Sequence, residues 1–313
     1  MTNPFVGAIF MFKNIEKMMK MNRRIRRWLE LGLFLLPAGL PLLVFWIYPI
    51  FSTFHLSFTD WDYMSPDYHV VGLANYLAMF REEAFYQALK TTLLFGIWTV
   101  VPTLALGFLM ALLLQGLKKA GTFCKTLVFS PWITPVVAVS IVWTWIYEPD
   151  RGAANQLLAM LGITGLPWLH SSQTALLSVA LTTVWKNIGY VMLFYIGALA
   201  RVPKELYEAA DVEGAGKGRI LTDITLPMIA PTTLFLTVLL TIQSLQAYDQ
   251  IQILTQGGPS GSTRTLLYRY YQLAFEQFDM GGAAATVTVL LVLTFLFSLI
   301  QFWWAGRYSG WEE

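Results

Sequence analysis

Charged residues and cysteines are scarce in this chain of 313 residues. Only 13% of the residues are charged and 56% are hydrophobic, whereas a soluble domain usually carries about 25% charged residues. The single cysteine, Cys124, excludes an internal disulfide framework and a cysteine-rich metal site. The three histidines lie far apart in the sequence and lack the spacing of metal ligands. The composition therefore predicts a membrane protein, and we assign neither catalytic residues nor metal ligands.

Six apolar segments are long enough to cross a membrane as helices. A hydrocarbon core of about 30 Å requires about 20 helical residues. The segments run approximately over 30–54, 89–115, 124–147, 173–199, 228–250 and 282–305. Several contain proline, which a membrane helix tolerates when neighbouring helices satisfy the freed backbone groups. The predicted fold class is an all-α polytopic membrane protein with about six transmembrane helices.

The positions of lysine and arginine indicate how the spans are oriented. The net charge of +2 says little about nucleic acid, and we expect no nucleic-acid partner. Basic residues gather before the first span and in every second connection. They are Lys13, Lys17, Lys20, Arg23, Arg24, Arg26, Arg27, Lys118, Lys119, Lys125, Arg201, Lys204, Lys217, Arg219 and Arg307. By the positive-inside rule, this side is cytoplasmic. Both termini and the 200–227 segment are therefore predicted to face the cytoplasm, as parts of a multi-pass protein of the cell membrane.

The predicted organisation is one membrane domain with short cytoplasmic ends. Residues 1–29 form a basic N-terminal segment, 30–305 the transmembrane domain and 306–313 a cytoplasmic tail. The sequence leaves open whether part of 1–27 is an interfacial helix or a disordered leader. Three amphipathic stretches in the outer connections, GLANYLAMFREEAFYQALKTT, AANQLLAMLGI and TLLYRYYQLAFEQF, predict short helices on the extracellular rim.

The connection over 201–227 is compact, charged and punctuated by glycines, and its residues 205–227 read ELYEAADVEGAGKGRILTDITLP. It fails the Walker nucleotide-binding pattern, because Gly216-Lys217 is followed by Gly218 in place of serine or threonine. It also fails the dinucleotide-binding fingerprint, because Arg219 stands where that pattern needs its third glycine. We therefore expect no phosphate-binding loop in this segment.

The same segment predicts a short helix, a turn and a second short helix. Pro203 suits the start of a helix, because its missing N–H would have no partner there. The first helix is expected over Lys204–Glu213, with Gly214 ending it in a left-handed cap, and the second over Arg219–Thr225. A helix of about ten residues is marginal alone in water. We therefore expect it to dock, either on its own bundle or on a cytoplasmic partner.

The spacing within this segment resembles the cytoplasmic signature of the permeases of ATP-binding-cassette (ABC) importers. That signature is Glu-Ala-Ala, three residues, Gly, nine residues, Ile, one residue and Leu-Pro. Its fixed positions are occupied here by Glu208, Ala209, Ala210, Gly214, Ile224, Leu226 and Pro227. The stretches VVGLANYLAMF, WTWIYEPDRGAANQLLAMLG, VWKNIGYVMLFYIGAL and LTQGGPSGSTRTLLYRYYQLAF are similar to the carbohydrate-uptake branch, and within it to the maltose and glycerol-3-phosphate permeases. The first 27 residues depart from the family pattern.

The resemblance implies a permease subunit that forms a sugar pathway across the membrane together with a second, similar permease. An extracellular solute-binding protein would deliver the sugar or oligosaccharide. Two ATPase subunits would bind ATP and magnesium, so this chain would hold no cofactor and would not be an enzyme. Glu208, Ala209 and Ala210 would dock in a cleft of the ATPase as a coupling helix, and Gly214 would make the turn. The closing Ile-x-Leu-Pro would fix the return of the chain into the fifth span.

Polar side chains within two spans are candidates for the sugar pathway, because polar groups inside a membrane are costly and often functional. The candidates are Thr183, Lys186 and Asn187 in the fourth span and Gln243, Gln246, Tyr248 and Asp249 in the fifth. Gln243, Gln246 and Gln250 are expected to share one helical face. The resemblance to maltose permeases places solute contacts near Thr183, Gln243 and Gln246. The alternative role for each residue is to hold neighbouring helices together.

Three roles are open for Lys186: an ion pair with Asp249, contact with an anionic or polar solute, or a structural contact. Four aromatic residues are expected either to stack on sugar rings or to pack in the core; they are Trp185, Tyr190, Tyr195 and Tyr248.

Two competing functions remain. A membrane enzyme would need a polar catalytic cluster, and a secondary transporter or channel working without an ATPase would be favoured by inverted repeats, which are not evident.

Overall fold

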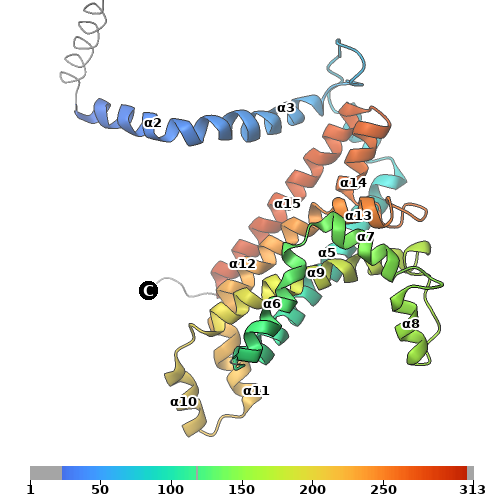
Figure 1. Cartoon of the computed structure of the whole chain (residues 1–313). Helices are drawn as coiled ribbons and strands as arrows, with labels where there is room; N and C mark the ends of the chain where they lie inside the picture. The colour runs from blue at the N-terminus through green and yellow to red at the C-terminus, as the bar shows by residue number, and fades with distance from the viewer. Residues whose placement is uncertain (1–22, 118, 309–313) are drawn as a thin grey trace, which may run out of the picture. The chain divides into compact units, whose positions relative to one another are not determined.

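The computed structural model describes residues 23–117 and 119–308, and almost every element in these ranges is a helix (Figure 1). The chain divides into two compact units, Met1–His55 and Leu56–Glu313. The interfacial helix or leader considered for 1–27 lies largely outside the described residues, although α2 already begins at Arg23. The predicted all-helical fold is confirmed within the described part of the chain.

The first span is a single long helical run. It consists of α2 (Arg23–Leu42), a π turn η1 (Leu43–Ile47) and α3 (Tyr48–Leu56). Its apolar stretch, Glu30–Leu56, is long enough to cross a membrane, and it covers the predicted segment 30–54. Large apolar side chains such as Leu33 and Phe34 are exposed along it, being 75% and 82% accessible. A helix that exposes such side chains is expected to face lipid or a partner.

Four long apolar helices form the frame of the larger unit: α5 (Glu83–Gln115), α9 (Ala175–Leu199), α12 (Leu226–Leu245) and α15 (Met280–Tyr308). Helix α9 lies at the centre and packs against α5, α6 and α12. Small residues allow these close approaches. A Cβ atom on Gly189 would lie 2.1 Å from the carbonyl oxygen of Val128 in α6, and one on Gly107 would lie 2.5 Å from the side chain of Val191.

The third predicted span, 124–147, is wrong as a single helix. The structure has α6 (Lys119–Ile133) and α7 (Val136–Ile146), which meet at a bend of 101°. The cause is Pro135, which removes a backbone donor and disfavours helical geometry at the residue before it. Pro135 itself is extended, with ψ of 135°. The described chain therefore has five helices able to cross a membrane, or six if the bent pair counts as one span.

The fifth predicted span, 228–250, is displaced. The helical run starts at α11 (Lys217–Ile220), passes through a π turn η3 (Leu221–Thr225) and ends as α12 at Leu245. The second short helix expected over Arg219–Thr225 is thus the beginning of the same run. The π turn is explained by Pro227, which cannot donate the next helical hydrogen bond. After a short non-helical link, α13 (Asp249–Leu254) begins.

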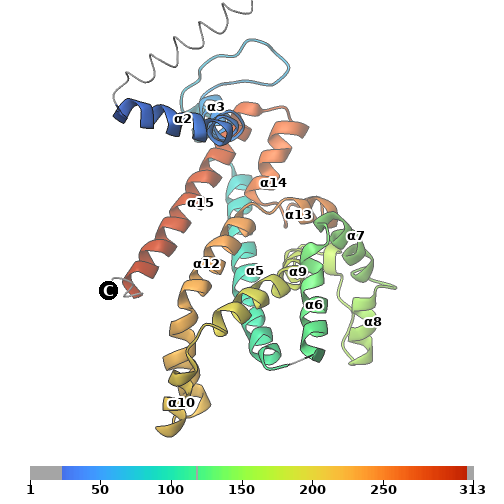
Figure 2. The same cartoon turned by 60° about the vertical axis from the view of Figure 1, so that its left-hand side comes forward.

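Short helices in the connections agree with the amphipathic stretches, with one difference. They are α4 (Ala74–Met79), α8 (Ala153–Met160), η2 (Trp168–His170), α14 (Leu266–Tyr271) and η4 (Gln272–Glu276). The first stretch is broken after α4, and its second half is the start of α5. Arg269 of α14 forms an ion pair with Glu82 beside that start. In both views, α13 and α14 lie toward one end of α12 and α10 (Lys204–Val212) lies at the other (Figure 1 and Figure 2).

Candidate functional site

The segment with the Glu-Ala-Ala signature forms a helical hairpin at one end of α12 (Figure 2). Helix α10 begins after Pro203, as predicted, and ends before Gly214, whose φ is +73°. The N–H of Ala215 donates to the carbonyl of Ala210 at 2.9 Å, which closes the helix end. A residue other than glycine would be strained at this φ. The predicted left-handed cap is therefore confirmed.

Part of the Glu-Ala-Ala signature is exposed on the surface of the hairpin. Glu208, Ala209 and Gly214 are exposed, whereas Ala210 is buried within the chain itself. Ile224 packs at the edge of the core cluster around α9 and α12. The hydroxyl groups of Tyr207 in α10 and Thr225 in η3 lie 3.3 Å apart and share a hydrogen bond. The exposed residues are thus accessible to a partner, while Tyr207 and Ile224 hold the hairpin to the core of its own bundle.

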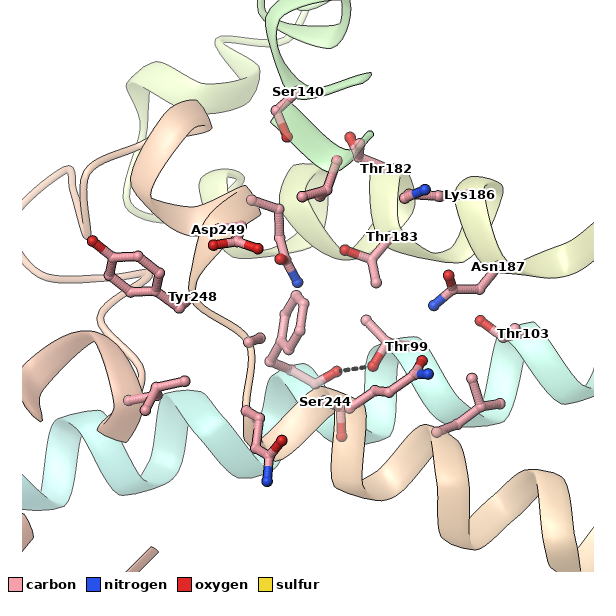
Figure 3. Close-up of a pocket in the computed structure, with 18 of the residues that line it drawn as sticks. Thr99, Thr103, Ser140, Thr182, Thr183, Lys186, Asn187, Ser244, Tyr248 and Asp249 are labelled. Atoms are coloured by element: carbon pink, nitrogen blue, oxygen red, sulfur yellow. Dashed lines mark hydrogen bonds between the residues drawn. The ribbon is translucent and has the colours of Figure 1, made fainter. Parts of the chain in front are cut away.

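A cavity of about 480 Å³ lies where α5, α7, α9, α12 and α13 meet (Figure 3). All seven residues predicted for the sugar pathway line it: Thr183, Lys186, Asn187, Gln243, Gln246, Tyr248 and Asp249. Of the other aromatic candidates, Tyr195 is buried and packs edge-on against Phe108, and Tyr190 stacks on Trp132. The structure gathers the polar candidates in one place, and their contact with a solute stays a prediction.

The expectation that Gln243, Gln246 and Gln250 share one helical face is wrong. Gln243 lies on α12, Gln246 caps the end of that helix, and Gln250 belongs to α13. The chain turns at Tyr248, whose φ and ψ are −135° and −58°. The three amides still line the same cavity, because the turn folds α13 back across its wall. The glutamines therefore approach one space from different backbone directions.

The contacts of Lys186 decide between the roles left open for it. Its ammonium group donates hydrogen bonds to the carbonyls of Pro131, Trp132 and Thr134 at 2.9, 3.0 and 2.7 Å. These carbonyls end α6 at the bend, where a helix leaves carbonyl groups without partners. The ammonium also lies 5.7 Å from the centre of the Trp132 ring. Within the described residues Lys186 makes no ion pair with Asp249, so that expectation is wrong and the structural role is favoured.

Two further cavity residues were not found from the sequence. The hydroxyl groups of Thr103 on α5 and Ser140 on α7 are buried, with side chains 1% and 0% exposed, and have no hydrogen-bond partner within residues 23–117 and 119–308. In Figure 3 the Ser140 hydroxyl points from α7 toward α9, and Thr103 faces Asn187. Nearby Thr99 instead bonds back to the carbonyl of Phe95 at 2.7 Å. The spacing of Thr99 and Thr103 along an apolar helix was the available signal.

Comparison with known proteins shows the family. Residues 77–310 match the model of the binding-protein-dependent transport system inner membrane component, and the chain belongs to this family. The resemblance to ABC-importer permeases is thereby confirmed. In overall structure the chain is similar to a bacterial ABC transporter involved in the import of the acidic polysaccharide alginate, with a TM-score of 0.78 and 23% identity over 91% of this chain and 98% of that chain. At this identity the likeness shows the fold alone.

Curated relatives extend over most of the chain. The diacetylchitobiose uptake system permease protein NgcF of Streptomyces coelicolor is 33% identical, covering 86% of this chain and 81% of the relative. The arabinooligosaccharides transport system permease protein AraP of Bacillus subtilis is 32% identical over 89% of each. The sn-glycerol-3-phosphate transport system permease protein UgpA of Agrobacterium fabrum is 30% identical over 83% of this chain and 88% of the relative. The chain is therefore a multi-pass membrane permease, similar to permeases of sugar ABC importers.

Proposed function

We propose that this chain is one of two permease subunits of an ABC importer and that the cavity between α5, α9 and α12 lies on the path of a sugar. The family match over 77–310 is the observation that carries the proposal. A solute-binding protein on the extracellular side delivers the sugar or oligosaccharide, and the second permease completes the pathway. Both termini and the hairpin of α10 and α11 lie in the cytoplasm, as the distribution of basic residues predicts.

The α10 hairpin is proposed to seat in a cleft of one of two ATPase subunits. Glu208 offers a carboxylate for basic or donor groups of that subunit, and Ala209 allows close backbone approach. ATP and magnesium bind on the ATPase, in agreement with the failed nucleotide motifs of this chain. Displacement of the hairpin reaches the cavity through one continuous helical run, because Lys217–Leu245 has no break and its end carries Gln243 and Ser244 in the cavity wall.

Solute recognition is proposed for the polar groups of the cavity wall. A sugar offers many hydroxyl groups, each able to donate and accept, and amide and hydroxyl side chains match both functions. Gln243, Gln246, Asn187 and Thr183 come from two different helical runs, so a bound sugar would bridge α9 and the end of α12. Ligand sites of this kind have a size of several hundred Å³ with a few convergent polar groups.

The proposal is tested by a charge reversal on the exposed face of α10. Glu208→Lys is expected to abolish co-purification of the ATPase subunits and ATP-driven uptake, because it places a cation against their donor groups. Glu205→Lys is the matched control, since Glu205 is an exposed carboxylate on the same helix. Uptake by this chain in liposomes without ATP or an ATPase would instead establish a secondary transporter or channel.

A further inference from the structure

Few charged side chains line the cavity, and they differ in how freely they can contact a solute. Among the described residues that line it, only Lys186 and Asp249 carry a full charge at neutral pH. The rest are apolar, hydroxyl, amide or phenol groups. How a solute can contact these two charged groups therefore depends on how much of their hydrogen-bonding capacity the protein already uses.

The positive charge is engaged. An ammonium group has three N–H donors, and Lys186 donates hydrogen bonds to three backbone carbonyls at distances of 2.7 to 3.0 Å. Moving it toward an anionic solute would leave those carbonyls of the α6 end without partners. The ammonium group therefore uses all of its N–H donors within the protein and has none left for a solute in the cavity.

The negative charge is available. Asp249 is exposed, and within the described part of the chain its carboxylate makes neither a hydrogen bond nor an ion pair. A carboxylate with free lone pairs accepts hydrogen bonds from neighbouring sugar hydroxyls and repels another carboxylate, a sulfonate or a phosphate.

The neutral part of the wall offers two hydroxyl groups to a polar ligand. Thr103 and Ser140 line the cavity from two different helices, and their buried hydroxyls have no partner among the residues that the structure describes. Buried hydroxyl groups are normally hydrogen-bonded, so an unpartnered pair lining a cavity indicates that something supplies the missing bonds. A sugar hydroxyl is able to give and receive such bonds at once.

We propose that this cavity selects uncharged saccharides and rejects anionic ones, with Thr103 and Ser140 binding sugar hydroxyls and Asp249 excluding negative charge. This deepens the proposed function and rests on it. The distinction matters because the curated relatives include permeases named for neutral oligosaccharides, two named for sn-glycerol-3-phosphate and one named for sulfoquinovosyl glycerol. Selectivity is thereby assigned partly to the permease, beyond the choice made by the solute-binding protein.

The test compares two disaccharide probes on the whole assembled importer without its binding protein. Maltose is neutral and digalacturonate is a similar α-1,4-linked hexose dimer with two carboxylates. Their Kd values are measured by saturation-transfer NMR. Maltose is expected to bind at least about tenfold more tightly, and Asp249→Asn is expected to reduce that preference by roughly tenfold through loss of the charge repulsion. Thr103→Val combined with Ser140→Ala is expected to weaken maltose binding by about tenfold, from two lost hydrogen bonds.

Thr126→Val is the matched control, because Thr126 lies on α6 outside the cavity wall and bonds to the carbonyl of Thr122. Equal or tighter binding of digalacturonate overturns the inference, and so does the absence of maltose binding up to tens of millimolar. Unchanged maltose binding in the double variant overturns the role of the two hydroxyls. ATP-driven uptake is measured in parallel: if it is present while the probe preference is absent, this inference fails and the importer function stands.

Discussion

The contact between Lys186 and the end of α6 allows us to predict how much stability its removal costs. Lys186→Met keeps an apolar stem of similar length and removes the ammonium group. A hydrogen bond to a charged group contributes about 1.5–3 kcal/mol, and three carbonyls lose their partner here. Solvent is expected to rehydrate part of them, since the contact to Thr134 is exposed. We therefore expect a loss of about 2–4 kcal/mol in stability.

The assay is thermal unfolding of the purified importer, read alongside the distance between α6 and α7. The single native Cys124 on α6 and an introduced Val142→Cys on α7 carry the two spin labels. In the Lys186→Met variant the distance distribution is expected to broaden, because the bend has lost the group that joins its carbonyls to α9. Lys186→Arg is expected to restore much of the order, since a guanidinium also donates several hydrogen bonds.

Lys90→Met is the matched control, because Lys90 is an exposed lysine near the start of α5, outside the cavity wall. If Lys186→Met unfolds at the same temperature as this control and leaves the spin-label distance unchanged, the structural role of Lys186 is refuted. If Lys186→Met is stable but selectively loses affinity for an anionic probe, Lys186 is a solute ligand and the charge argument for the cavity fails with it.

Three further substitutions test other parts of the structure, and the two glycine substitutions have matched controls within the chain. Gly189→Ala forces a methyl group into the backbone of α6 and is expected to cost at least about 1–3 kcal/mol in thermal unfolding, whereas Gly197→Ala on the same helix meets nothing within 4 Å and is expected to be neutral or stabilising. Gly214→Ala is expected to cost about 1–2 kcal/mol and to weaken ATPase association, because its φ of +73° strains a Cβ, whereas Gly216→Ala has ordinary φ and free space and is expected to preserve association. Thr103→Val is expected to leave stability unchanged or increased while weakening solute binding, because it removes a buried hydroxyl without a partner; a clear loss of stability would show that this hydroxyl is satisfied within the protein.

Much of the fold and the α10 hairpin could be predicted from the sequence because the signals are local. Apolar length defines a span regardless of its neighbours, and Pro203 and Gly214 mark helix ends through their own backbone restrictions. The end of α12 could not be found in this way. Residues 246–250 are mostly polar but compatible with a helix, and at the turn the ring of Tyr248 packs against Tyr268 and Tyr271, which are distant in the sequence.

The cavity illustrates the same limit. Its seven predicted residues could be found because a polar group within an apolar span is conspicuous. Ser140 is one of two hydroxyl residues of α7, and such residues usually bond back to their own helix, as Thr144 does; only the folded structure shows that Ser140 faces a cavity. The partners of Lys186 were also hidden, because the carbonyls that it binds become available only where the chain bends between α6 and α7.

The continuity of the helical run from Lys217 to Leu245 links the two sites physically. A rigid helix carries displacement along its axis, whereas a break would absorb it, and the π turn η3 is the place in this run where the backbone departs from regular α-helical bonding. Thr225 lies in that turn and joins α10 through Tyr207. Helix α10 is therefore connected to this run twice. The chain joins it to α11, which precedes the π turn, and the hydrogen bond of Tyr207 joins it to the turn itself. We therefore expect motion imposed on α10 to reach α12 without relying on the weak intrinsic stability of a nine-residue helix.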